Sequence, residues 1–331
     1  MSVFVAGATG ATGAIGRRLV LLLIERGHEA TAMTRTEAKV AGLRAVGAAP
    51  VVADGLDADA VMRAVSAARP EVIVHEMTAL SSMGANLRRF DRDFELTNRL
   101  RTQGTDALLA AARRTDTRRV VAQSFAGWPY AREGAWVKSE EDRLDPHPPQ
   151  GMQRTLAAIG HLEGAVAGAG DIEGLVLRYG TLYGPGTSLA RDGEHAEMIR
   201  RRRFPIVGQG TGVWSFVHID DAAAATVAAI QGGVPGVLNV VDDDPAPVCE
   251  WLVALADALG AKPPRRVPLW LGRLATGEVG VSLMTQVRGA SNEKAKRELG
   301  WRPRHPSWRS GFREGLDDSA QGRRGPAGAI T

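Results

Sequence analysis

The chain has a single cysteine among its 331 residues, Cys249. It therefore cannot form an internal disulfide bond, and no metal site can be built from cysteines alone. This usage fits a reducing compartment, and we expect the cytoplasm. Long apolar runs are also absent, because the longest, residues 19–24, falls far short of the roughly 20 residues that span a bilayer. We therefore expect no membrane partner.

Charge of one sign forms no long run in the sequence, and the most basic stretch, RRRRF (200–204), is typical of a solvated helix end. The formal net charge is only +4, from 41 basic and 37 acidic residues. Nucleic-acid-binding proteins present a basic stripe interleaved with aromatic residues, and this chain has no such stripe. We therefore expect a small-molecule substrate and no nucleic-acid partner, and we consider a homodimer as its assembly.

Short apolar runs alternate with helical patterns through the first half of the chain. The apolar runs lie at residues 2–6, 28–34, 49–53, 71–75, 118–123 and 172–178. The helical patterns lie at 15–26, 36–47, 57–68, 86–114 and 151–166. This alternation predicts an α/β fold, a doubly wound parallel (Rossmann) sheet that binds its ligand at the carboxyl ends of the strands. Asp57 and Asp220 are the predicted N-caps of two helices.

The pattern divides the chain into three parts. Residues 1–178 plus about 213–242 are predicted to form the Rossmann domain. A smaller C-terminal substrate lobe is predicted for residues 179–212 plus about 243–316. Residues 317–331 are polar and rich in glycine without any apolar period, so we expect a flexible tail.

A glycine-rich stretch, VAGATGATGAIGRRLV, joins the first strand to the first helix. It places glycines at positions 7, 10, 13 and 16. A dinucleotide-binding turn needs three glycines, which make the tight turn, let the backbone approach the pyrophosphate, and let the helix pack closely on its strand. Two registers are possible, namely Gly7, Gly10 and Gly13, or Gly10, Gly13 and Gly16.

We favour the second register, in which Gly7 belongs to an extra bulge before the loop. This register puts Ile15, Leu19 and Leu22 on one face of the helix, where they can pack on the sheet. The predicted cofactor loop also includes Thr12, Ala14 and Ile15.

The end of the second strand bears on the choice of cofactor. An acidic residue there would bind the ribose 2′-hydroxyl and favour NAD. The sequence has Arg35 instead, placed for a 2′-phosphate, with Thr34 and Thr36 as hydroxyl donors. We therefore predict NADP in preference to NAD. After the third strand, the predicted cofactor contacts are Asp54, at the adenine amino group, and Gly55.

Several motifs follow one another in a characteristic order. They are GATGAIG (10–16), VVADGLD (51–57), VIVHEMTA (72–79), TNRLRTQGTDALLAAA (97–112), LRYGTLYGPGT (177–187), WSFVHIDDAAAAT (214–226), LNVVDDDPAP (238–247) and AKRELGWRP (295–303). In this order, over almost the whole chain, they resemble the extended short-chain dehydrogenase/reductase family, also called NAD-dependent epimerase/dehydratase. The resemblance implies NAD(P) in the first domain, a substrate cleft under the smaller lobe, and chemistry by Ser/Thr, Tyr and Lys.

The acid–base pair that this resemblance implies is missing. The family places its tyrosine four residues before its lysine, and none of the three tyrosines here has a lysine at that spacing. Aligning Glu163 with the family's acidic residue puts Thr155 in the tyrosine slot and Ile159 in the lysine slot. Neither side chain can do that acid–base work. Thr155 is kept as a predicted substrate contact.

Other residues are left to carry the chemistry. Ser124 fills the serine slot and is predicted to be catalytic, while Tyr130, in the loop after the fifth strand, is the candidate proton donor. Tyr183, in the YGPGT loop, is a predicted substrate contact, and we predict no metal.

Three functions stay open. The favoured one is an atypical NAD(P)-dependent oxidoreductase acting on a small organic substrate, such as a natural-product intermediate. The alternatives are a redox-neutral isomerase, dehydratase or cyclase, and a catalytically silent NADP-binding sensor.

Overall fold

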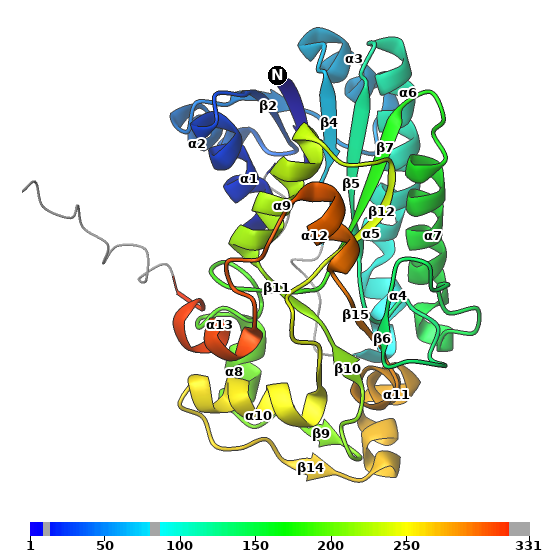
Figure 1. The fold of residues 1–331 in the computed structure, drawn as a ribbon, viewed down its shortest axis with the longest axis vertical. Helices are drawn as coiled ribbons and strands as arrows, with labels where there is room; N and C mark the ends of the chain where they lie inside the picture. Colours follow the sequence, from blue (N-terminus) through cyan, green and yellow to red (C-terminus); the bar gives the residue numbers. More distant parts are fainter. Residues whose placement is uncertain (9–13, 80–86, 318–331) are drawn as a thin grey trace, which may run out of the picture.

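The computed structural model describes residues 1–8, 14–79 and 87–317, and a parallel sheet lies at its centre (Figure 1). Within these residues the sheet has seven strands in the order β12-β7-β5-β4-β1-β2-β3. They are β1 (Ser2–Ala6), β2 (Glu29–Thr34), β3 (Ala49–Val52), β4 (Val72–His75), β5 (Arg119–Phe125), β7 (Glu173–Tyr179) and β12 (Gly236–Val240). This order confirms the doubly wound α/β prediction.

Helices cover both faces of the sheet. On one face lie α1 (Ala14–Glu25) and α9 (Ile219–Gln231), and on the other α3 (Ala58–Ala68), α6 (Thr105–Arg114) and α7 (Gln153–Ala167). Neighbouring residues of a strand point to opposite faces, so Val5 packs in the first layer and Phe4 in the second. Both are fully buried, which explains why the strands are continuous apolar runs. After β2, a short turn of 3-10 helix (Glu37–Lys39) leads into α2 (Val40–Ala45).

The helix predicted over residues 86–114 is broken into several pieces. A 3-10 turn (Leu87–Arg89) is followed by α4 (Phe90–Asp93), α5 (Glu95–Arg99), a π-helical turn η3 (Leu100–Gly104) and α6. At Gly104 a Cβ atom would lie 3.0 Å from the Met77 methyl group, so the chain passes close to the end of β4 there. Single π turns within α-helices occur frequently at functional sites.

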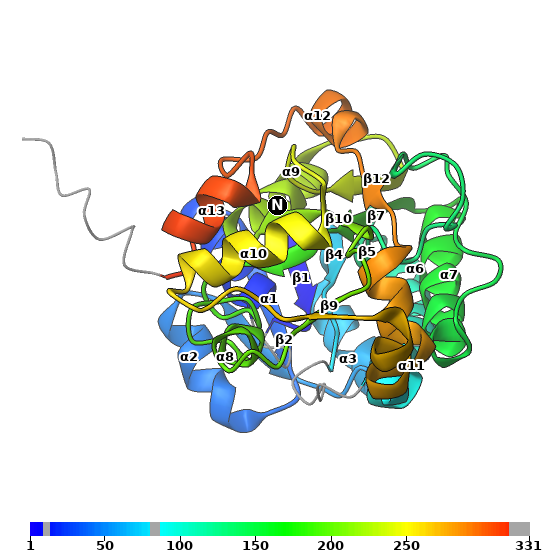
Figure 2. The ribbon, with the colours of Figure 1, turned by 90° about the horizontal axis from the view of Figure 1, so that it is seen from below.

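The rest of the chain forms a layer beneath the carboxyl edge of the sheet, which Figure 2 shows from below. Its helices are α8 (Glu194–Arg200), α10 (Val248–Ala258), α11 (Leu269–Thr285) and α13 (Trp308–Glu314), while α12 (Glu293–Leu299) packs on the main sheet's α9 side. Short strand pairs connect them: β8 (Thr181–Tyr183) with β11 (Phe216–His218), β9 (Ile206–Val207) with β14 (Arg266–Val267), β10 (Val213–Trp214) with β13 (Ala246–Pro247), and β6 (Val137–Lys138) with β15 (Gly289–Ala290). The buried side chains of Phe216, Trp251, Trp308 and Phe312 form its core. Among the described residues no helix is long and apolar enough to cross a membrane.

Candidate functional site

The carboxyl ends of β1 and β4 meet where the chain order of the sheet reverses, and the glycine loop begins there. Gly7 follows β1 with a φ of +92°, a conformation that favours glycine, and a Cβ atom on it would lie 2.6 Å from the Glu76 carbonyl group. At Gly16, in α1, a Cβ atom would lie 2.7 Å from the carbonyl oxygen of Ala8. The first glycine therefore makes the tight turn, and the second lets the helix pack on the strand, as a dinucleotide site requires.

Each predicted register contains only one of these two constrained glycines. Gly10, Thr12 and Gly13 lie outside the described residues, so the choice of register stays a prediction. The favoured register assigns Gly7 to a bulge outside the glycine triplet. The backbone nevertheless leaves no more room for a side chain at Gly7 than at Gly16, so we expect Gly7→Ala to be harmful. α1 begins at Ala14, and Ile15 is buried against the sheet. The free N–H groups of this helix start can bind a phosphate.

The residues predicted to bind the adenosine half lie at the ends of the next two strands. Arg35 follows β2 directly and is exposed, whereas Thr34 before it is buried. Asp54 is exposed two residues after β3, and Gly55 is buried against Met77 so tightly that a side chain there would overlap the methionine sulfur. These positions fit a dinucleotide whose adenosine half lies over β2 and β3.

The α7 positions predicted to correspond to the family's tyrosine and lysine are Thr155 and Ile159. Thr155 is fully buried, and its backbone N–H and hydroxyl donate to Oδ1 of Asp91 at 2.9 and 2.7 Å. Asn98 donates to the same hydroxyl at 3.1 Å. Ile159 is fully buried and has no polar atom in its side chain. Because the Thr155 hydroxyl is already engaged, its predicted contact with substrate gains no support from this geometry.

Ser124 and Tyr130 lie in one buried hydrogen-bond network. The Ser124 hydroxyl donates to Oε1 of Glu163 at 2.6 Å, and Arg178 donates to both Glu163 oxygens at 2.8 and 2.5 Å. Arg178 also donates to the Tyr130 hydroxyl at 2.9 Å, which donates to Asn239 at 2.6 Å. Burial raises the pKa of Tyr130 above its ordinary value. The network joins β5, α7, β7 and β12, and the catalytic roles predicted for Ser124 and Tyr130 gain no support from it.

Tyr183 lies in the core of the lower layer. Its ring packs edge-on against Phe216 and Phe312, and its hydroxyl is enclosed without a hydrogen-bond partner among the described residues. Gly311 provides the space, because a Cβ atom there would overlap the tyrosine ring. Burial raises the pKa of this phenol well above its ordinary value. The predicted contact of Tyr183 with substrate is therefore not supported by its position.

Sequence reasoning did not single out Glu76, the residue after β4. Its Oε1 accepts a hydrogen bond from the Tyr179 hydroxyl at 3.1 Å, while its buried Oε2 has no partner within the part of the chain that the structure describes. Burial raises the pKa of Glu76 to about 8, so the group is a neutral acid at pH 7. The preceding His75 bonds to Thr105 on the opposite face at 3.1 Å, and burial lowers its pKa to about 4. An acidic residue directly after an apolar strand was the available signal.

Sequence reasoning also did not single out Arg101, in the π turn. Its side chain is 4% exposed, and its buried Nη1 atom has no hydrogen-bond partner in residues 1–8, 14–79 and 87–317. Burial lowers the pKa of Arg101 to about 10, so it remains a cation at pH 7. The helical period places it on the same face as the buried Thr97, Thr105 and Leu108. A charged residue in helical register with Thr97, Thr105 and Leu108 was the signal here.

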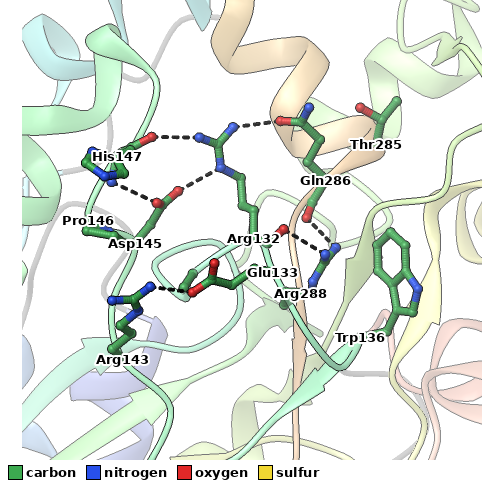
Figure 3. A pocket seen from close by; sticks show the side chains of 11 residues that line it. Arg132, Glu133, Trp136, Arg143, Asp145, Pro146, His147, Thr285, Gln286 and Arg288 are labelled. Atoms are coloured by element: carbon green, nitrogen blue, oxygen red, sulfur yellow. Dashed lines mark hydrogen bonds and ion pairs between the residues drawn. The ribbon is translucent and has the colours of Figure 1, made fainter.

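A separate cavity of about 430 Å³ lies between residues 131–147 and the segment after α11 (Figure 3). Most of its charges are paired, since Arg132 binds Asp145 at 2.7 Å and Arg143 binds Glu133 at 2.5 Å. Arg288, whose guanidinium lies 3.9 Å from the centre of the Trp136 ring, donates to two backbone carbonyls. The cavity shares no residue with the glycine loop or the α7 slots.

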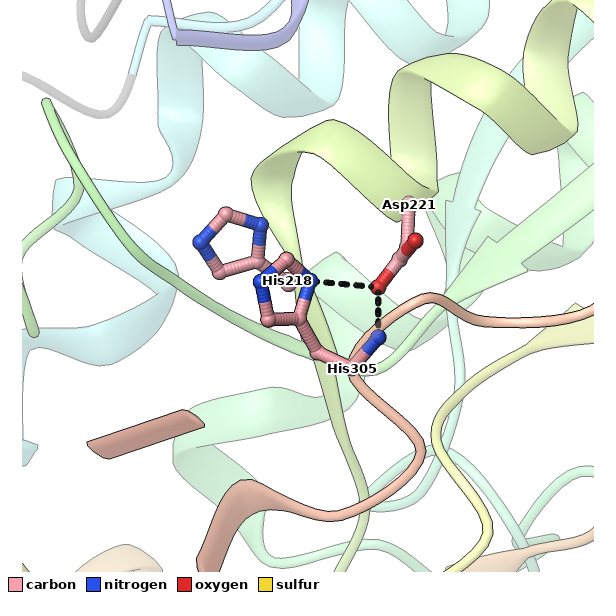
Figure 4. A group of neighbouring side chains, drawn as sticks. All are labelled: His218, Asp221 and His305. Atoms are coloured by element: carbon pink, nitrogen blue, oxygen red, sulfur yellow. Dashed lines mark hydrogen bonds and ion pairs between the residues drawn. The ribbon is translucent and has the colours of Figure 1, made fainter. Parts of the chain in front are cut away.

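Two histidines and an aspartate cluster at the start of α9 (Figure 4). Asp221 accepts from the backbone N–H groups of Arg304 and His305 at 2.8 and 2.9 Å, and contacts the His305 ring at 3.0 Å. His218 uses both ring nitrogens, accepting from the Asp220 N–H at 3.2 Å and contacting the Gly315 carbonyl at 3.0 Å. His218, not Asp220, therefore caps α9, which corrects the sequence prediction. The cluster fastens the C-terminal segment to the sheet domain.

The family model described as "NAD dependent epimerase/dehydratase family" matches residues 8–240, well over half of the chain. The chain belongs to this family. The resemblance seen in the motifs is thereby confirmed, and this epimerase/dehydratase family member is an NAD(P)-dependent enzyme of the Rossmann type.

Named relatives of this family member include reductases. It is 46% identical over 315 residues to 3-diazoavenalumate denitrifying reductase of a Streptomyces species, covering 94% of this chain and 99% of that protein. It is 26% identical, over a 340-residue alignment, to 4-hydroxy-2-methyl-3-oxo-4-farnesyl-3,4-dihydroquinoline-1-oxide ketoreductase of Stigmatella aurantiaca, covering 97% and 96%. These relatives support an oxidoreductase acting on a small organic molecule.

Solved structures show the same fold. UDP-glucose 4-epimerase of Thermotoga maritima is 22% identical, with a TM-score of 0.72 over 96% of this chain and 97% of that one. The UDP-glucose 4-epimerase of Thermus thermophilus, in complex with NAD, is 24% identical, with a TM-score of 0.70 over 98% and 100%. At these identities the likeness establishes the architecture of the family member and not its substrate.

Proposed function

We propose that this enzyme reduces a small organic substrate bearing a diazo group and releases the nitrogen, with NADP(H) as hydride donor. The observation that carries the proposal is the 46% identity, over 94% of the chain, to a reductase whose name describes the denitrification of a diazo compound. The match covers 99% of that relative, so both parts of the fold are included.

The absence of an acid–base pair at the two α7 positions fits this reaction better than it fits carbonyl reduction. Hydride addition to a carbonyl leaves an alkoxide, which needs a proton donor such as the family's tyrosine. Hydride addition to a carbon bearing N₂⁺ forms a C–H bond while the C–N electron pair leaves with neutral N₂. The balance is ArN₂⁺ + H⁻ → ArH + N₂, and no proton is consumed. Thr155 and Ile159, which occupy the two slots, supply none.

The chain's own residues would hold the cofactor as follows. Gly7 and Gly16 exclude side chains around the turn, and the N-terminus of α1 would bind the pyrophosphate. Exposed Arg35 would pair with the 2′-phosphate, which supports NADP over NAD, and Asp54 would contact the adenine. When bound, the reduced nicotinamide supplies the hydride.

Carbonyl reduction is the second candidate, favoured by the ketoreductase relative at 26% identity. It would require a proton from substrate or water, or from a group outside the α7 slots.

The proposal is tested with an aromatic diazo compound that also carries a carboxylate, such as diazotised 3-amino-4-hydroxybenzoate. NADPH oxidation is followed at 340 nm and released N₂ is measured by mass spectrometry. Because diazonium compounds can oxidise NADPH without an enzyme, the Gly16→Val variant is the background control. We expect one N₂ for each NADPH oxidised. Oxidation of NADPH with ketone probes but not with the diazo probe would support the ketoreductase candidate instead.

A further inference from the structure

Arg101 is held at the carboxyl edge of the sheet by its neighbours. The hydroxyl of Thr105 donates to the Arg101 carbonyl at 2.7 Å and also bonds to His75, the last residue of β4, at 3.1 Å. The negative charge of Glu163 acts on the guanidinium, and Glu163 is bonded to Ser124 near the end of β5. The charge of Arg101 also acts on His75, so the buried cation lies within electrostatic reach of the ends of β4 and β5.

The surroundings of this cation leave its hydrogen-bonding capacity unused. An arginine has five N–H donors, and no hydrogen bond or ion pair from Arg101 is found among the described residues. The ring of Phe94 has its centre 5.8 Å from the guanidinium carbon. One turn earlier, the Oδ1 atom of Asn98 is also buried without a partner there. Buried polar groups are nearly always paired, so two unpaired groups on one helical face indicate a missing ligand.

The opposite helix lacks the cation that the family resemblance implies. The family places its lysine on α7, and in this chain that slot holds Ile159, which is apolar and fully buried. Arg101 approaches from η3, the element that packs against α7. A guanidinium also presents a planar pair of N–H groups that matches a carboxylate, which a lysine does not.

We propose that Arg101 binds an ionised oxygen of the substrate, a carboxylate or a phenolate, at the ends of β4 and β5. This inference deepens the proposed function, on which it rests for the reaction, and names the substrates as organic anions. Asn98 Oδ1 is placed to accept a hydrogen bond from a neutral hydroxyl of the same molecule. Arg101 would then orient the substrate without donating a proton, because its pKa of about 10 keeps it charged at neutral pH.

Binding of a diazo-free probe tests the inference separately from the reaction. 3-Amino-4-hydroxybenzoate, its methyl ester and its 4-methoxy analogue are titrated by calorimetry into wild type, Arg101→Met and Arg101→Lys, each saturated with NADP⁺. Arg99→Met is the matched control, because Arg99 is exposed two residues away, at the end of the adjoining α5. We expect Arg101→Met to weaken binding of the acid about 30-fold or more, the loss typical of removing one member of a buried charge pair. Arg99→Met should leave it unchanged.

The methyl ester and the 4-methoxy analogue show which oxygen of the probe Arg101 binds. If the carboxylate is the ligand, wild type should discriminate against the ester and Arg101→Met should not; if the phenolate is the ligand, the 4-methoxy analogue should be rejected instead. Arg101→Lys should restore part of the affinity. Equal binding of all three probes by wild type, or unchanged discrimination in Arg101→Met, would overturn the inference.

Stability separates a binding role from a structural one. Replacing a buried, unpaired cation by methionine should leave the melting temperature of the ligand-free protein unchanged or higher. A lower melting temperature together with unchanged NADP⁺ affinity and unchanged probe discrimination would make Arg101 structural. If the probe binds through Arg101 but wild type fails to reduce the diazo compound, the proposed function fails and the anion site remains.

Discussion

Replacing Glu76 by glutamine should remove a pH-dependent penalty on folding. In the folded protein burial raises the pKa of Glu76 from 4.5 to about 8, whereas the unfolded chain has the ordinary value. The folded state therefore keeps its proton between these two values while the unfolded state loses it. Stability contributed by this group is fully present below pH 4.5 and is lost as the pH rises toward 8.

The size of the penalty follows from the difference between the pKa of Glu76 in the folded and unfolded states. Each pH unit between the two pKa values costs about 1.4 kcal/mol, so the penalty reaches about 3 kcal/mol at pH 7 and about 5 kcal/mol above pH 8 as an upper estimate. Glutamine has nearly the same shape and stays neutral. Its amide oxygen can still accept the hydrogen bond that Tyr179 donates to Glu76 at 3.1 Å.

Urea unfolding at pH 5, 7 and 9, followed by tryptophan fluorescence, measures the effect. The free energy of unfolding of Glu76→Gln relative to wild type should rise by roughly 3 to 5 kcal/mol between pH 5 and 9. Glu37→Gln, which changes an exposed carboxylate, controls for the general effect of charge removal. Parallel pH curves for wild type and Glu76→Gln would refute the reasoning and would mean that Glu76 is ionised when buried.

Three further substitutions test the site, and a fourth, Gly27→Ala, is a control. Gly27→Ala, at a φ of +73° in open space, should lower the free energy of unfolding by about 1–2 kcal/mol. Gly7→Ala should lower it further, because the Cβ atom would also overlap backbone atoms. It should also abolish NADPH binding, measured by fluorescence titration. Arg35→Asp should weaken NADPH binding several-fold to a hundredfold and NADH binding far less, since one charge-assisted hydrogen bond is worth roughly 1.5–3 kcal/mol; equal losses in calorimetry would contradict the NADP assignment. Tyr130→Phe should lower stability by about 1–3 kcal/mol and keep kcat within tenfold. A hundredfold loss of kcat at unchanged stability would instead make Tyr130 the proton donor.

The sequence allowed the sheet domain to be predicted closely because its signals are local. Continuous apolar runs marked the buried strands, and the predicted cap Asp57 accepts from the Ala60 N–H at 2.9 Å. The helix predicted over 86–114 was wrong as a single element. The last break, between the π turn and α6, lies at Gly104, where the chain passes close to Met77 after the end of β4, a contact between distant parts of the chain.

The candidate site was harder to predict because a side chain's partner lies far away in the sequence. Nothing local to Ser124 indicates that its hydroxyl binds Glu163, and nothing local to Tyr183 indicates that its ring is buried in the lower layer. The position of each residue within its motif was the only basis for predicting a catalytic role for Ser124 and a substrate contact for Tyr183. The sequence likewise does not reveal that one buried atom of Glu76 and one of Arg101 have no hydrogen-bond partner among the described residues, because this depends on how distant parts of the chain fold around them.

Transfer of a deuterium label from the cofactor to the substrate shows whether the enzyme replaces the diazo group by hydride. The enzyme is incubated in ordinary water with NADPH deuterated at C4 of the nicotinamide and with diazotised 3-amino-4-hydroxybenzoate, and the product is analysed by mass spectrometry and NMR. Hydride transfer from the cofactor places one deuterium on the carbon that lost nitrogen and releases one N₂ for each NADPH oxidised. Loss of nitrogen with hydrogen from the solvent at that carbon, or no enzyme-dependent loss of nitrogen, would contradict the proposed function.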